Sequence, residues 1–144
     1  MKNQLVAVES ANGNVKWKFD TTGPVWATPI LKDNVIYFGD TSSKIYALSS
    51  KEGSLAWSGD APGPIIATPA LTPNGLAFVC ETGDILQVGF QNERSWSSKV
   101  ANGKLYSSPA VIGERLVIPV QEGDPLMVSY DLSGRNGWTF AAPK

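Results

Sequence analysis

Three polar side chains recur where a repeated strand pattern ends. Asp40, Glu81 and Gln121 each follow the second predicted strand of a repeating unit. Oxygen acceptors gathered at one opening could take a cation or a polar ligand. The same residue types are frequent in turns, because they tolerate turn geometry and contact with water. We favour the turn interpretation for these three residues. It extends to three further aspartates, Asp60, Asp84 and Asp124.

Candidate nucleophiles are few. Cys80 ends the apolar run 76–80, and the chain contains no histidine that could activate it. A buried small hydrophobic residue is therefore the favoured interpretation of Cys80. Thr28, Thr68 and Ser108 could present hydroxyl groups to a channel, but a hydroxyl residue before proline in a strand needs no catalytic explanation. We predict no catalytic, cofactor-binding or metal-binding residue and expect that the chain is not an enzyme.

These residues lie within a repeat of 40 residues. Its clearest mark is the sequence Ala-Thr-Pro at 27–29 and 67–69, which becomes Ser-Ser-Pro at 107–109. Proline cannot donate a hydrogen bond to a neighbouring strand, so a proline-bearing strand belongs at the rim of a sheet. Three such strands at one interval indicate three copies of a sheet arranged radially. We expect Pro29, Pro69 and Pro109 to line a central channel.

The strands between the turns are apolar on both faces. The runs 35–38, 76–79 and 116–120 do not alternate between apolar and polar residues. A sheet that is covered on both sides produces this pattern. No helical period is present anywhere. Stacked sheets around an axis are therefore predicted.

Tryptophans follow a second periodic pattern. A glycine stands four residues before three of them, in the pairs Gly13 and Trp17, Gly53 and Trp57, and Gly134 and Trp138. Small residues, Ala7 and Ala47, stand ten positions before the first two tryptophans. In the remaining copy Glu93 replaces the glycine and Trp96 comes one residue early. Tryptophan needs a large slot and a partner for its N–H. We predict that Trp17, Trp57 and Trp138 are largely buried between strands.

The segment 7–17 resembles the A-x-D-x-x-T-G-x-x-x-W docking motif of the PQQ-like β-propeller repeat family. The segment 45–57 is similar to the same repeat. The resemblance is weaker in the last two copies, where Gln87 or Val88, and Val128 or Ser129, stand at the alanine position.

This resemblance implies an all-β fold, a β-propeller of four-stranded antiparallel blades. About three and a half blades would be present: a half-blade at 4–20 and blades at 25–60, 65–101 and 105–142. Complete members of the family close as rings of seven or eight blades, so the sequence looks like a piece of such a ring. An open arc leaves two apolar faces without partners. We expect that the chain is not a stable isolated monomer, and that it is either a fragment of a larger ring or a protomer that borrows strands from another copy.

The family also includes quinoprotein dehydrogenases, which hold their cofactor with an adjacent-cysteine disulfide, a stacking tryptophan and a calcium site with a catalytic aspartate. Cys80 is the single cysteine, so that disulfide cannot form within this chain. No stretch has the spacing of a calcium loop. We therefore expect no quinone cofactor and no metal.

Charge and composition limit the partners. The 144 residues carry 12 basic and 13 acidic side chains, a net charge of −1, without a basic stripe. Nucleic acid is therefore not an expected partner. The apolar runs are too short for a membrane-spanning helix, so no membrane insertion is expected. The first residues run directly into a strand pattern, which predicts no signal peptide in this chain. The resemblance nevertheless implies an extracytoplasmic location, in the periplasm or at the cell surface.

The resulting hypothesis is a non-catalytic binding or scaffolding propeller whose loops meet a protein, polymer or small-ligand partner. The partner could also be the missing propeller blades or a second copy of the chain. The alternative is a fragment of a PQQ-dependent quinoprotein dehydrogenase whose cofactor residues lie outside this chain.

Overall fold

The computed structural model describes residues 3–143, which form fourteen strands, β1 to β14. The first six are β1 (Gln4–Val8), β2 (Val15–Asp20), β3 (Ile30–Lys32), β4 (Val35–Gly39), β5 (Lys44–Ser49) and β6 (Leu55–Asp60). The next four are β7 (Ala70–Thr72), β8 (Gly75–Val79), β9 (Asp84–Val88) and β10 (Arg94–Lys99). The last four are β11 (Ala110–Ile112), β12 (Arg115–Pro119), β13 (Met127–Asp131) and β14 (Asn136–Phe140).

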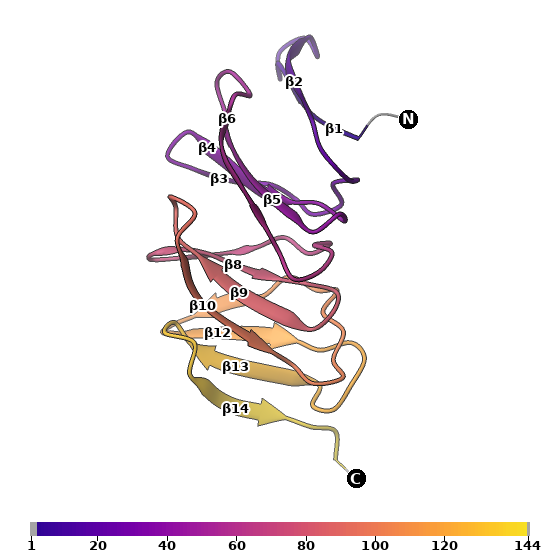
Figure 1. Cartoon of the computed structure of the whole chain (residues 1–144), viewed down its shortest axis with the longest axis vertical. Coiled ribbons are helices and arrows are strands. Elements are labelled where there is room, and N and C mark those ends of the chain that lie inside the picture. Colours follow the sequence, from indigo (N-terminus) through magenta and orange to yellow (C-terminus); the bar gives the residue numbers. More distant parts are fainter. Residues whose placement is uncertain (1–2, 144) are drawn as a thin grey trace.

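The strands form antiparallel meanders that stack one behind another (Figure 1). Three sheets have four strands, in the orders β3-β4-β5-β6, β7-β8-β9-β10 and β11-β12-β13-β14. Strands β1 and β2 form a two-stranded sheet at the N-terminal end of the stack. This is the predicted architecture, about three and a half propeller blades. Within residues 3–143, no helix is long and apolar enough to cross a membrane.

The proline-bearing segments lie at the sheet rims, as predicted, but their strands are shorter than expected. β3, β7 and β11 are edge strands of three residues each, and each begins directly after Pro29, Pro69 or Pro109. Because proline cannot join a strand ladder, the residues before it find other partners. The carbonyl groups of Pro24 and Pro64, for example, accept hydrogen bonds from loop N–H groups.

The prediction that all three prolines line a channel is wrong for two of them. Pro69 and Pro109 are buried, whereas Thr28 and Ser108, which stand beside the equivalent prolines, are exposed. Alternate residues of an extended segment point to opposite sides. The open side of these segments therefore carries hydroxyl groups, while Pro69 and Pro109 turn away from it.

The hydrophobic core is divided into three clusters, each centred between successive sheets. Trp17, Phe38, Tyr46 and Leu48 form the cluster between the N-terminal sheet and the first blade. Larger clusters follow between the first and second blades and between the second and third blades. Each sheet thus shares its buried apolar residues with clusters that reach the neighbouring sheets.

Burial along the strands confirms the prediction drawn from their apolar patterns. β8 lies in the middle of the stack and is buried at every position. Its residue Phe78 belongs to the cluster on one side and Val79 to the cluster on the other. β14, which is the last strand, is exposed at every position because no sheet covers it.

Three of the repeated tryptophans contact the sheet that follows their own. The indole N–H groups of Trp17, Trp57 and Trp96 donate hydrogen bonds of 3.0, 2.9 and 3.1 Å to backbone carbonyls of the next sheet's outer hairpin. The acceptors belong to Ser50, Phe90 and Leu132. Trp17 is 9% exposed, and Trp57 and Trp96 are half-buried. Trp138, however, is 46% exposed, so its predicted burial is wrong, because no sheet follows β14 within residues 3–143.

The strand register decides which residues occupy the alanine position of the motif. Ala7 pairs with Trp17 and Ala47 with Trp57. In the second blade Gln87 pairs with Trp96. In the third blade the hydroxyl of Ser129 accepts a 2.9 Å hydrogen bond from the backbone N–H of Trp138. The equivalents of Ala7 and Ala47 are therefore Gln87 and Ser129, not Val88 and Val128.

Trp57 is expected to be a main support of the contact between the first two blades. Replacing Trp57 by alanine removes the hydrogen bond to Phe90 and the packing against Tyr37, so we expect a loss of about 3–5 kcal/mol in the free energy of unfolding. Urea unfolding measures this loss. The control is Trp26→Ala, since Trp26 is 72% exposed. Equal effects of the two substitutions would contradict the role of Trp57.

Candidate functional site

A cleft crosses the inner segments of all three four-stranded blades, residues 24–29, 64–69 and 104–109, which precede β3, β7 and β11. It has a volume of about 630 Å³. Its walls are formed by Trp26, Thr41, Pro64, Ile66, Glu81 and Tyr106. Trp26, Ile66 and Tyr106 occupy the same place in successive repeats, one residue before each small-small-proline sequence. The cleft is thus built by the repeat itself, from one residue of each blade and the loops beside it.

Sequence reasoning missed these three residues. The 40-residue interval between Trp26, Ile66 and Tyr106 is visible in the sequence. However, an apolar residue in an apolar run is usually buried, so nothing in the sequence marked these positions as accessible. In the structure Trp26 is 72% and Tyr106 37% exposed. Trp26 and Tyr106 are exposed because they lie on the open side of the inner segments, the side that also carries Thr28 and Ser108.

Two hydrogen bonds with the Gln121 side chain hold the segment around Tyr106. The backbone N–H of Tyr106 donates to Oε1 of Gln121 at 2.9 Å, and Nε2 of Gln121 donates to Oγ of Ser107 at 2.6 Å. Partial burial and the nearby carboxylates of Glu122 and Glu81 raise the pKa of the Tyr106 phenol. The ring therefore stays uncharged at neutral pH. The cleft combines two accessible aromatic rings with the acidic side chain of Glu81.

The three predicted acceptors do not form one equivalent set. The backbone N–H groups of Thr41, Glu81 and Gln121 make the same hydrogen bond in successive blades, to the carbonyls of residues 24, 64 and 104. Asp40 comes one residue before Thr41, so the equivalent residues in the next two blades are Cys80 and Val120. The predicted alignment of Asp40 with Glu81 is therefore wrong by one residue. Glu81 lines the cleft, whereas Asp40 is buried.

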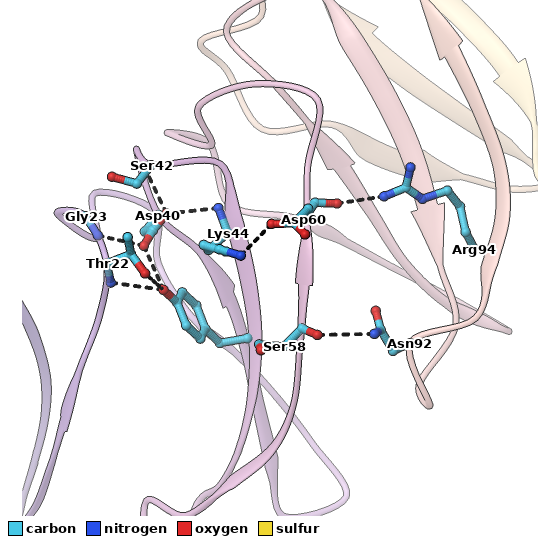
Figure 2. Close-up of polar contacts among 10 residues, drawn as sticks. Thr22, Gly23, Asp40, Ser42, Lys44, Ser58, Asp60, Asn92 and Arg94 are labelled. Carbon is cyan, nitrogen blue, oxygen red and sulfur yellow. Dashed lines mark hydrogen bonds and ion pairs between the residues drawn. The ribbon is translucent and has the colours of Figure 1, made fainter.

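The Asp40 carboxylate is enclosed by hydrogen-bond donors from its own loop, from Gly23 and from β5 (Figure 2). It accepts hydrogen bonds from the backbone N–H groups of Gly23, Ser42 and Lys44 at 2.8, 2.9 and 3.0 Å. The hydroxyl of Tyr46 lies 2.9 Å from its second oxygen. A buried carboxylate needs such partners. Asp40 thus fixes the turn between β4 and β5 and the entry to the inner segment, in agreement with the favoured interpretation.

The other predicted turn aspartates differ among themselves. Asp60 is the last residue of β6 and pairs with Nζ of Lys44 at 2.5 Å. Asp84 begins β9 and accepts hydrogen bonds from Thr82 and Lys99. Both therefore lie at strand ends and not in turns. Asp124 lies in the loop before β13, as expected.

The predicted hydroxyl groups have a structural use in one case. The hydroxyl of Thr68 accepts a 3.0 Å hydrogen bond from the backbone N–H of Thr28. This contact joins the inner segments of two successive blades. Thr28 and Ser108 are exposed.

Cys80 lies in the buried cluster between the first two blades. Burial raises the pKa of its thiol to about 11. The thiolate is the reactive form of cysteine, so this environment suppresses reactivity at neutral pH. The prediction of a buried, unreactive residue agrees with these surroundings.

The described residues do not fit the quinone cofactor of the related dehydrogenases. Cys80 is the single cysteine of the sequence and is buried. Among residues 3–143, no group of three or more histidine, cysteine or acidic side chains is placed to hold a metal ion. The carboxylate of Asp40 already has its partners within the protein.

Stacked four-stranded meanders, joined by tryptophans that contact the next sheet, define this protein as a β-propeller arc. A family model described as outer membrane protein assembly factor BamB matches residues 1–106. The chain therefore belongs to the PQQ-like β-propeller repeat family. A comparison with curated proteins finds no match.

Solved structures of two kinds share the fold. BamB from Moraxella catarrhalis has 16% sequence identity and a TM-score of 0.73, over 98% of this chain and 46% of that protein. The quinohemoprotein alcohol dehydrogenase ADHIIG from Pseudomonas putida HK5 has 15% identity and a TM-score of 0.82, over 96% of this chain and 31% of the enzyme. The quinohemoprotein alcohol dehydrogenase from Comamonas testosteroni has 17% identity and a TM-score of 0.70, over 83% of this chain and 21% of the enzyme. The chain thus spans less than half the length of each.

Asp40 is expected to be essential for stability. Asp40→Ala leaves the N–H groups of Gly23, Ser42 and Lys44 without their acceptor, so we expect a loss of at least about 3 kcal/mol in the free energy of unfolding. Urea unfolding monitored by circular dichroism measures it. Asp60→Ala is the control. Because the Asp60 side chain is 79% exposed, its ion pair should contribute less than about 1 kcal/mol. A loss below that of the control would refute the role of Asp40.

Cys80 is expected to react slowly in the folded protein. A pKa raised from 9.0 to about 11 lowers the thiolate fraction near pH 8 by roughly 100-fold, and burial slows access further. Reaction with a chromogenic disulfide reagent should therefore be at least about 100-fold slower in the native protein than in guanidinium chloride. Comparable rates in both conditions would show that Cys80 is accessible.

Proposed function

We propose that this chain is a non-catalytic binding or scaffolding module that receives a segment of a partner protein in the cleft across its blades. The supporting observation is the cleft itself, where Trp26, Ile66 and Tyr106 come together from three successive repeats. Exposed tryptophan and tyrosine side chains are typical of the residues that contribute most to protein–protein binding.

The chemistry of the cleft favours a segment with apolar and basic side chains. Pro64 and Ile66 offer apolar contact between the two aromatic residues. Glu81 supplies a negative charge in the same cleft. A lysine or arginine could pair with this carboxylate while its charged group approaches an aromatic face. Rigid blades would hold these groups in place before the partner binds, which lowers the entropic cost of association.

The family supports an extracytoplasmic location. The matching family model is described as an outer membrane protein assembly factor, a description that concerns proteins acting at the outer membrane. We propose that this chain works in the same part of the cell, with a protein partner or with further propeller blades. Nucleic acid and membrane insertion have no part in the proposal.

A second candidate function is part of a quinoprotein dehydrogenase. The specific observation in its favour is the TM-score of 0.82 with an alcohol dehydrogenase over 96% of the chain. In that case the cofactor residues would lie outside this chain, because the described residues do not fit the quinone.

The scaffolding proposal is tested by selecting peptides from a random displayed library on the immobilised chain. We expect selected peptides to be rich in apolar and basic residues, and a Trp26→Ala, Tyr106→Ala double variant to bind them at least about tenfold more weakly. Leu55→Ala is the matched control, since Leu55 is exposed on the outer strand β6. Peptides that bind the double variant as well as the wild-type chain would refute the role of the cleft.

The alternative is tested separately by equilibrium dialysis of the chain against pyrroloquinoline quinone and Ca²⁺. The scaffolding proposal predicts no retention of the quinone above that of an unrelated protein. Saturable retention, competitive with the selected peptides, would favour the dehydrogenase.

A further inference from the structure

Side chains of the second blade close the outer edge of the first. β6 is the outer strand of its sheet, so one of its two edges faces away from β5. On that edge, Nδ2 of Asn92 donates a 3.3 Å hydrogen bond to the Ser58 carbonyl, and Nη2 of Arg94 donates a 2.6 Å hydrogen bond to the Asp60 carbonyl (Figure 2). An open sheet edge can pair with a further strand unless it is covered in this way. The edge of β6 is therefore occupied within the chain.

β10 presents the corresponding edge of the second blade. In the strand register, Ser97 and Lys99 of β10 take the places that Ser58 and Asp60 take in β6. Backbone groups alternate between the two edges of an antiparallel strand. Because the carbonyls of Ser58 and Asp60 point away from β5, those of Ser97 and Lys99 point away from β9.

The third blade carries smaller residues where the second blade has Asn92 and Arg94. Gly134 takes the place of Asn92: both have positive φ, +87° and +69°, and each follows by two residues the carbonyl that accepts an indole N–H. Asn136 takes the place of Arg94 in the strand register. Among residues 3–143, the side-chain hydrogen bonds between these two blades involve other groups and do not reach the two outward carbonyls of β10.

A groove remains where the shorter side chain of Asn136 stands in place of arginine. It lies between the end of β10 and the outer strands of the third blade, and its volume is about 180 Å³. Lys99 lies in one wall, while Asp124, Tyr130 and Asn136 belong to the other. The two walls come from sheets that follow one another in the stack (Figure 1). The groove is therefore a feature of the contact between the second and third blades and not of either end of the stack.

The groove contains a carboxylate whose charge is not balanced by the described residues. Nζ of Lys99 lies 3.1 Å from the Asp84 carboxylate, so the positive charge of Lys99 is already paired. Asp124 takes part in none of the ion pairs formed within residues 3–143. In the contact between the first two blades, the guanidinium of Arg94 occupies the corresponding place. Charge and shape thus both favour a guanidinium group in the groove.

We propose that the outer edge of β10 receives an extended segment of a partner protein as an additional strand, with an arginine side chain of that segment in the groove. In an extended segment the N–H groups of residues two apart point to the same side. They can therefore reach the carbonyls of Ser97 and Lys99, which are also two residues apart. The arginine would pair with Asp124 and donate to the Lys99 carbonyl, as Arg94 donates to Asp60. This site lies on the outer strands, so it does not depend on the partner proposed for the cleft on the inner segments.

The probe for this site is a ten-residue peptide of alternating threonine and serine, with arginine at its fifth position. Titration followed by NMR should shift the backbone amide signals of Ser97 and Lys99, and these shifts should saturate. The same peptide methylated on the backbone nitrogens of its central residues should not bind, because it cannot donate hydrogen bonds to a strand edge. Citrulline in place of arginine keeps the shape and removes the charge, so binding should weaken at least about tenfold.

Two variants test the groove and its charge separately. Asn136→Arg supplies within the chain the guanidinium that the partner would bring, so it should weaken binding of the probe at least about tenfold. Leu55→Arg is the matched control, since Leu55 is exposed and takes the register position of Asn136 in the first blade. This control should bind the probe as the wild-type chain does. Asp124→Asn should remove the preference for arginine over citrulline.

The reverse change should open a second site. In an Asn92→Gly, Arg94→Asn double variant the β6 edge loses both capping side chains, and glycine fits the positive φ at residue 92. We expect this variant, with its fold verified by circular dichroism, to bind a second equivalent of the probe. A wild-type chain without saturable binding would overturn the proposal. So would a methylated peptide that binds as well as the probe, an Asn136→Arg variant that binds the probe undiminished, or a folded double variant that binds a single equivalent.

Discussion

The structure depends on apolar contact between successive sheets. No sheet of this chain has a core of its own, because its buried residues belong to clusters shared with the sheets before and after it. The repeated tryptophan contact joins each sheet to the next, since the indole N–H donates to one carbonyl of the next hairpin. Stability is therefore a property of neighbouring pairs of sheets.

This arrangement also creates the candidate site. Stacking equivalent sheets brings residue 26 of one blade beside residues 66 and 106 of the following blades, and a cleft results that no single blade contains. Polar contacts hold its loops. Asp40 joins the turn after β4 to the entry of the inner segment, and Thr68 links the first two inner segments. Hydrogen bonds thus connect the loops and inner segments that form the cleft.

The two functional classes found among the solved structures share this scaffold, which shows how little the fold alone decides. The chain belongs to the PQQ-like β-propeller family, and the similar structures include both an assembly factor and alcohol dehydrogenases. In this chain the cleft across the blades is lined by Trp26, Ile66, Tyr106 and the acidic Glu81, while Cys80 is buried between two blades.

The sequence by itself determined the sheet architecture, because proline, glycine and tryptophan at fixed intervals impose local geometry that tertiary contacts do not override. The 40-residue period placed each proline segment at a sheet rim, and the apolar runs identified the doubly covered strand β8. Only the tertiary structure decided which tryptophans are buried, since Trp138 has the same local motif as Trp57 but no sheet beyond it. It also decided the register that separates Asp40 from Glu81, because a shift of one residue exchanges the two faces of an extended segment. The exposure of Trp26 has the same origin: the side of a strand that faces solvent depends on where its neighbours lie.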